Sequence, residues 1–195
     1  MVRGVMLRGL RITAVVALFE CACASSGPPL TVPGAGSTGS PRTAGSSSSA
    51  PSGDDDALAR VTTIHGGAGP WVVAGYRMGE YALVRLGLQR QSFDLEVVHH
   101  TPQEVQFSCI ADGAAAATGA SAGKLNLRLV DAAEADVATT YRRRSTGQAI
   151  TLRPARAFTA RFRDVPRDQL AQAGRVVLAL PDADVFEELP ASPPP

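Results

Sequence analysis

The segment PWVVAGYRMGEYALVRLGL, from Pro70 to Leu88, has the residue spacing of an amphipathic helix. Pro70 suits a first helical turn, and Gly87 suits a helix end. Gly75 and Gly79 lie four residues apart and therefore on one helix face, where they let a second element approach closely. Its apolar positions are Val72, Val73, Tyr76, Tyr81, Leu83, Val84 and Leu86.

The glycine-rich turn HGGAG, residues 65–69, leads into this helix. Two interpretations stay open. The turn either only redirects the chain, or presents its free N–H groups to an anion.

The residues that follow predict a sheet with helices on one face. Alternating side chains indicate strands, and the alanine-rich run CIADGAAAAT indicates a buried helix. The predicted strands are 93–98, 124–130, 137–143 and 148–153, and the predicted helices are 57–61, 109–118 and 167–180.

The first 24 residues have the pattern of a secretory signal peptide. A basic start is followed by the apolar run 12–19 and by the sequence Ala22-Cys23-Ala24. That run is too short to span about 30 Å of hydrocarbon. Cys21 and Cys23 also resemble the lipidated cysteine of bacterial lipoproteins, so plain secretion and a lipid anchor both stay open. We expect an exported protein, in the periplasm, the cell envelope or outside the cell.

The remainder divides into a linker, one domain and a short tail. Residues 25–56 are rich in Ser, Gly and Pro and poor in large apolar residues, which is typical of a disordered linker. We predict one compact domain over residues 57–190 and a disordered tail over 191–195.

The charge balance excludes a general attraction to nucleic acid or to an anionic membrane. The chain has 19 basic and 18 acidic residues, a net charge of +1. Residues 141–167 hold eight arginines and one aspartate, without the interleaved aromatic residues that stack bases. This stretch is interpreted as a solvated basic face or as a site for a phosphate or lipid headgroup.

The same motifs together resemble the FmdE family, which takes its name from a component of formylmethanofuran dehydrogenase. They occur in the family's order between about Ile64 and Leu189: His65-Gly66, Pro70, Gly75-Tyr76-Arg77-Met78-Gly79, Cys109-Ile110-Ala111-Asp112-Gly113, Thr118-Gly119, Gly123-Lys124-Leu125-Asn126 and Leu178-Ala179-Leu180-Pro181-Asp182. The resemblance implies an α+β fold with a mixed sheet packed against helices. It also implies a metal, with zinc the expected ion, among His and Cys side chains.

The expected metal site is degenerate. His65 and Cys109 are kept, whereas Gly67, Gly69 and Ala120 stand where the family has further ligands. Zinc needs at least three protein ligands. Completing the set requires His99, His100 or Asp112.

A separate ligand-binding group is predicted at the first helix and the loop before a strand. Its members are Tyr76, Arg77, Asp112, Lys124 and Asn126, which suit a small anionic ligand. The alternatives for single residues also stay open: Arg77 as a surface salt-bridge partner, and a histidine of the 99–100 pair as a core residue.

Three hypotheses for function follow. The first is an exported, non-catalytic module that binds a metal or small ligand. The second is a metal- or thiol-dependent enzyme in which Cys109 works with a histidine. The third is a surface protein that binds a partner through the arginine-rich stretch. Nucleic acid is not an expected partner, a membrane is expected only through a lipid anchor, and formation of a homo-oligomer stays open.

Overall fold

A computed structural model describes residues 53–190 of the chain. The predicted signal peptide, most of the predicted linker and the predicted tail lie outside the described residues. The first helix, α1, spans Gly53–His65 and is longer than the predicted segment 57–61. Asp54, Asp55 and Asp56 lie in its first turn, where carboxylates interact favourably with the helix dipole.

The predicted central helix is present as α2, Pro70–Leu86. It ends where Gly87 adopts a left-handed conformation with φ of 61°. The partner that its small residues admit is α3, Val105–Thr118. A Cβ atom on Gly75 would lie 2.1 Å from the carbonyl oxygen of Ile110, and one on Gly113 would lie 1.9 Å from that of Val72. The two backbones therefore touch, which only glycine at these positions permits.

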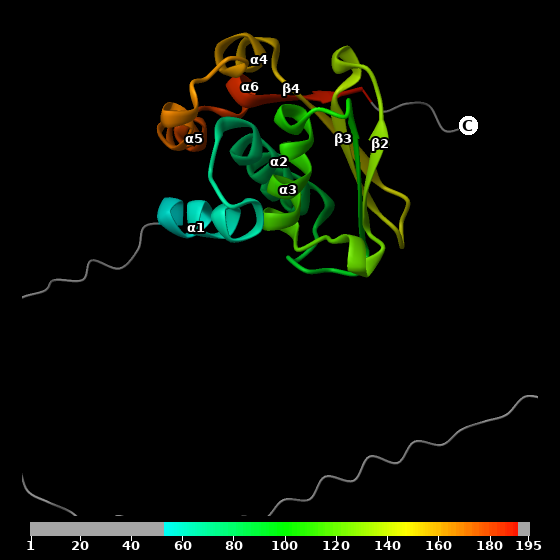
Figure 1. Ribbon diagram of the computed structural model, residues 1–195. Coiled ribbons are helices and arrows are strands. Elements are labelled where there is room, and N and C mark those ends of the chain that lie inside the picture. Colours follow the sequence, from blue (N-terminus) through cyan, green and yellow to red (C-terminus); the bar gives the residue numbers. More distant parts are fainter. Residues whose placement is uncertain (1–52, 191–195) are drawn as a thin grey trace, which may run out of the picture. The chain divides into compact units, whose positions relative to one another are not determined.

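Five strands form one mixed sheet in the order β2-β1-β3-β4-β5. β1 pairs in parallel with β2, and every other neighbouring pair is antiparallel. Figure 1 shows α2 and α3 against one face of this sheet. The predicted α+β class with a mixed sheet is thus confirmed. The strands are β1 Leu95–Thr101, β2 Leu127–Asp131, β3 Ala138–Arg143, β4 Ala149–Pro154 and β5 Phe186–Leu189.

Three elements near the end of the domain were not predicted. They are α4, Arg156–Phe162, α6, Asp182–Val185, and β5. The last long helix, α5, spans Leu170–Ala179, because residues 167–169 form a 3-10 turn. In α4, Phe158 is buried and its ring lies 5.0 Å from that of Trp71. Burial of this aromatic pair gives the short helix a place in the core.

The predicted strand 124–130 is shorter and less buried than its alternation suggests. β2 begins only at Leu127, because Leu125 has a φ of 52° in the preceding turn. Leu125 is 85% exposed and Leu129 is 54% exposed. β2 is an edge strand, so the helices cover its apolar side incompletely.

His99 lies in β1 and is fully buried, and burial lowers its pKa to about 4. Its Nδ1 lies 2.9 Å from the Thr139 hydroxyl and its Nε2 lies 3.1 Å from the Phe107 carbonyl oxygen. The unfolded chain binds a proton at this residue near pH 6.5, whereas the folded chain does so only near pH 4.

We therefore predict that the free energy of unfolding falls as the pH drops from about 6.5 to about 4. At pH 4.5 the loss attributable to His99 should be about 2 to 3 kcal/mol. Urea unfolding at pH 7.5 and pH 4.5, for the wild type and for His99→Gln, measures it. The carboxylates contribute equally to the pH dependence of the wild type and of His99→Gln, so the difference between the two reports on His99. An unchanged pH dependence in His99→Gln would contradict the assignment.

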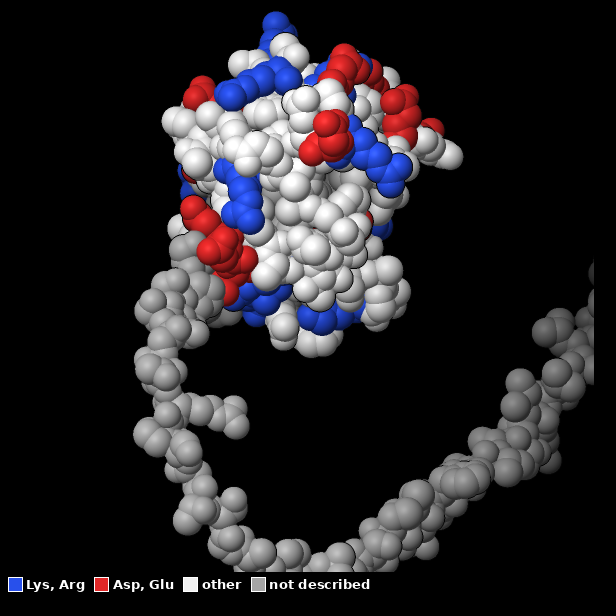
Figure 2. Space-filling model, turned by 60° about the vertical axis from the view of Figure 1, so that its left-hand side comes forward, with Lys and Arg blue, Asp and Glu red and all other residues white. Residues whose placement is uncertain are grey.

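Four of the eight arginines in the arginine-rich stretch form ion pairs in the folded domain. Arg142 pairs with Glu96, Arg143 with Asp94, Arg153 with Glu187 and Arg163 with Glu134. These acids all lie outside residues 141–167. On the face shown in Figure 2, basic and acidic side chains are interspersed. None of the helices in the described part of the chain has the length and apolar character needed to cross a bilayer.

Candidate functional site

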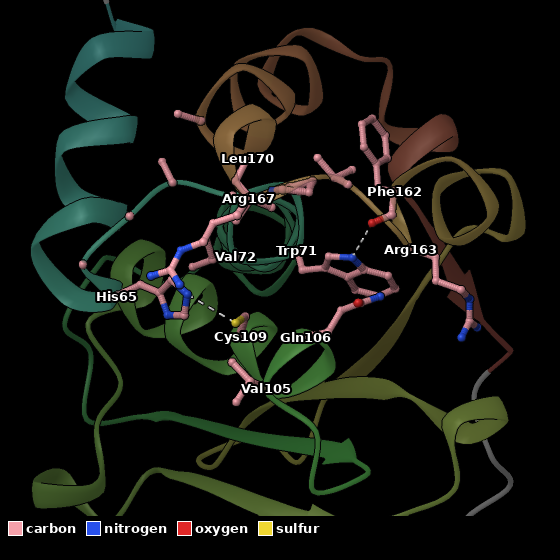
Figure 3. A pocket seen from close by; sticks show the side chains of 17 residues that line it. His65, Trp71, Val72, Val105, Gln106, Cys109, Phe162, Arg163, Arg167 and Leu170 are labelled. Atoms are coloured by element: carbon pink, nitrogen blue, oxygen red, sulfur yellow. Dashed lines mark hydrogen bonds between the residues drawn. The ribbon is translucent and has the colours of Figure 1, made fainter.

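A pocket of about 620 Å³ lies where the loop between α1 and α2 meets the first turn of α3 and the start of α5. Figure 3 shows its walls. Apolar side chains from α2, α3 and α5 face it, together with an imidazole, a thiol and two guanidinium groups. Its polar and aromatic side chains include His65, Trp71, Gln106, Cys109, Arg163 and Arg167.

The glycine-rich loop determines where the imidazole lies. α1 ends at His65, and Gly66 follows with φ of 84° and an N–H that donates to the Thr62 carbonyl oxygen at 2.8 Å. The chain then turns into α2 at Pro70. Gly174 of α5 packs so closely on this loop that a Cβ atom there would lie 1.9 Å from the carbonyl oxygen of Ala68. The loop is therefore held between two helices.

Three side chains form a connected triad, of which His65 and Cys109 line the pocket and Asp112 contacts His65 from outside the lining. The His65 Nε2 atom lies 3.2 Å from the Cys109 Sγ atom, and its Nδ1 atom lies 2.8 Å from an oxygen of Asp112. Cys109 and Asp112 are three residues apart on α3, so both face the same direction. When the Nδ1–H group of His65 donates a hydrogen bond to the Asp112 carboxylate, the Nε2 atom carries no proton and can accept one from the thiol.

The environment of Cys109 favours the neutral thiol. Burial, and then the negative charge of Asp112, raise the pKa of Cys109 to about 11. Proton transfer from the thiol at neutral pH therefore needs a base in contact with it. His65 is in contact with it.

The other two histidines lie elsewhere. Both ring nitrogens of His99 are engaged within the core by Thr139 and Phe107. His100 lies on the opposite face of β1, among Glu96, Val98 and Arg142. The structure therefore brings only His65, of the candidate histidines, beside Cys109.

The predicted ligand-binding group is not assembled around a common cavity. Arg77 donates to the carbonyl oxygens of Val177 and Leu180 and pairs with Asp182, so it holds the end of α5. Tyr76 is buried in the core, and burial raises its pKa. Of this group, Asp112 alone belongs to the triad.

The remaining two members, Lys124 and Asn126, stabilise the loop before β2. The Lys124 ammonium donates to the Gly119 carbonyl oxygen at 2.9 Å. The Asn126 side chain accepts from the Ser121 N–H at 2.9 Å and donates to the Leu95 carbonyl oxygen at 3.1 Å. Their hydrogen-bonding groups are therefore used within the fold.

The geometry of the triad does not suit zinc. His65 Nε2 and Cys109 Sγ face each other at the pocket, but Asp112 contacts the opposite ring nitrogen of His65. No group of three or more His, Cys, Asp or Glu side chains in residues 53–190 is arranged to hold a metal ion. Two donors are one fewer than a catalytic zinc site uses. The described residues therefore do not fit zinc.

Trp71 and Arg167 are among the pocket residues that were not identified as site residues from the sequence. Trp71 lies in the pocket wall, and its indole N–H donates to the Phe162 carbonyl oxygen at 2.9 Å. Arg167 lines the opposite side, beyond the end of α4. Trp71 directly follows Pro70 in the loop-to-helix turn, and this position could have indicated a place beside the glycine-rich loop. Nothing in the local sequence separates Arg167 from its neighbouring arginines.

Comparison with known proteins agrees with the motifs. A family model described as FmdE, molybdenum formylmethanofuran dehydrogenase operon, matches residues 64–187. The chain belongs to the FmdE family. The match covers nearly the whole described FmdE domain, from the pocket histidine to β5. No curated protein matches the chain.

Proposed function

We propose that this FmdE domain binds a small organic molecule in the pocket beside Cys109, His65 and Asp112. One observation carries the proposal: His65 and Cys109, two members of the triad joined at 3.2 Å and 2.8 Å, line a cavity of about 620 Å³. Pockets of this size with mainly apolar walls and a few polar groups are typical of small-molecule sites.

The arrangement of the polar groups supports a ligand rather than a purely structural role. Structural polar groups pair within the fold, as His99 and Asn126 do. The Cys109–His65 pair instead lies at the edge of an open cavity, and the described donors fall short of a zinc site. A small molecule is therefore the occupant that the pocket fits best.

Binding is tested through Trp71, the only tryptophan in the chain. Four probes are titrated: phenylacetate, phenylacetamide, hexanoate and hexanamide. At least one should change the tryptophan fluorescence saturably and slow alkylation of Cys109 by iodoacetamide, read by peptide mass spectrometry. In Val105→Trp, which fills part of the pocket wall, the protection should be lost. If no probe protects Cys109, the proposal fails.

A second candidate function is thiol-dependent catalysis. The order thiol, imidazole, carboxylate is that of a nucleophile, a base and a group that orients the base. His65 would accept the Cys109 proton as the sulfur adds to a carbonyl carbon, whose C=O π pair moves to the oxygen, and Asp112 would hold the imidazole. The raised pKa of Cys109 makes this transfer obligatory, because little thiolate exists at neutral pH.

The place of action is also part of the proposal. The leader sequence supports export, with or without a lipid anchor. Expression of the full chain in a bacterial host should give a processed protein outside the cytoplasm, and incorporation of radiolabelled palmitate separates the anchored form from the secreted one. An unprocessed cytoplasmic protein would contradict the proposed export and would leave the proposal for the pocket unaffected.

A further inference from the structure

The charges around the pocket are unbalanced. Among the described residues that line it there is no Asp or Glu, whereas Arg163 and Arg167 both line it. Arg163 is neutralised by Glu134. Within residues 53–190, the Arg167 side chain takes part in no salt bridge or hydrogen bond. Arg167 is therefore the lining arginine without an ion-pair partner in residues 53–190, while the Asp112 carboxylate of the triad pairs with His65.

The position of that charge links it to the triad. Figure 3 shows the Arg167 side chain extending toward His65, on the opposite side of the pocket from Trp71. A guanidinium group binds carboxylates through two parallel N–H donors. The remaining walls include Val72, Leu170 and, across the pocket, Trp71, which offer apolar surface to the rest of a ligand.

A second donor on the wall has no partner. The amide nitrogen of Gln106 is buried and makes no hydrogen bond within the described chain. Buried polar groups are nearly always paired in folded proteins. An acceptor oxygen of a bound molecule would satisfy this amide after rotation of the side chain.

We propose that the pocket is selective for small organic acids, with Arg167 binding the carboxylate and the apolar walls holding the hydrocarbon part. This inference rests on the proposed function, because it names the class of ligand for the same pocket. The neutral alternative, an uncharged molecule of the same shape, leaves Arg167 without a role in binding.

The same four probes test the inference, because each acid has an amide of matched shape. In the wild-type chain we expect the acids to bind at least about tenfold more tightly than the amides. In Arg167→Gln this preference should disappear while the amides bind unchanged. Arg156→Gln, which removes an exposed arginine that does not line this pocket, is the matched control and should keep the preference.

The outcomes separate the two proposals. Equal binding of acids and amides to the wild type, with protection of Cys109, overturns acid selectivity and leaves the binding function standing. If Arg167→Gln still prefers acids, another group binds the carboxylate, and the proposed role of Arg167 is overturned. Failure of all four probes to protect Cys109 overturns both.

Discussion

Gly113→Ala is expected to destabilise the domain by about 3 kcal/mol or more, or to prevent folding. The added methyl group would lie 1.9 Å from the Val72 carbonyl oxygen and 2.6 Å from the Tyr76 nitrogen. Both are backbone atoms of α2, so no side chain can rotate out of the way. Relief requires α2 and α3 to separate, which opens the core and the pocket wall together.

Urea unfolding followed by circular dichroism measures this effect. Gly123→Ala is the matched control, because the nearest atom to its new methyl group is 4.0 Å away. That variant should unfold within about 0.5 kcal/mol of the wild type. A Gly113→Ala chain as stable as Gly123→Ala would show that the two helices are not in backbone contact.

Cys109 is expected to react with iodoacetamide roughly 100-fold more slowly in the folded chain than in the urea-unfolded chain at pH 8. The reactive species is the thiolate, and burial together with Asp112 raises the pKa of this thiol to about 11. The rate should keep rising with pH through about pH 10, since the thiol is still mostly protonated there. Peptide mass spectrometry distinguishes this cysteine from Cys21 and Cys23.

Asp112→Asn distinguishes the inert thiol from an activated one. If Asp112 acts on Cys109 mainly through its charge, removing that charge lowers the pKa of the thiol and speeds alkylation. If Asp112 instead orients His65 as the base of a catalytic thiol, the same change slows it. We expect acceleration in the absence of ligand. Asp136→Asn, an exposed carboxylate after β2, should have no effect.

The helices and strands were predictable where one residue pattern decided the structure. The apolar spacing after Pro70 predicted α2, and Gly75 predicted a close neighbour, which is α3. β5 and α4 were not predictable in the same way, because their burial depends on partners far away in the sequence, such as β4 for β5. The local alternation 124–130 was misleading because it says nothing of a strand's place at the edge of the sheet.

The site was predictable in part. His65 and Cys109 could be paired through the family motifs, and the structure places them in contact. That Asp112 contacts the far nitrogen of His65 follows from the position of α1 relative to α3, which the sequence does not show. Arg167 was hidden among arginines. Only the folded chain separates the four arginines paired with Glu96, Asp94, Glu187 and Glu134 from those that are not, and shows that Arg167 lines the pocket.

His65 and Cys109 share one accessible pocket, and NMR of the three histidine rings can detect this shared environment. Alkylating Cys109 with iodoacetamide replaces the S–H donor with a bulkier group beside the imidazole. The ring signals of His65 should shift strongly, while those of His99 and His100 should stay within line width. Unmoved His65 signals on a fully alkylated, folded chain would contradict the shared pocket.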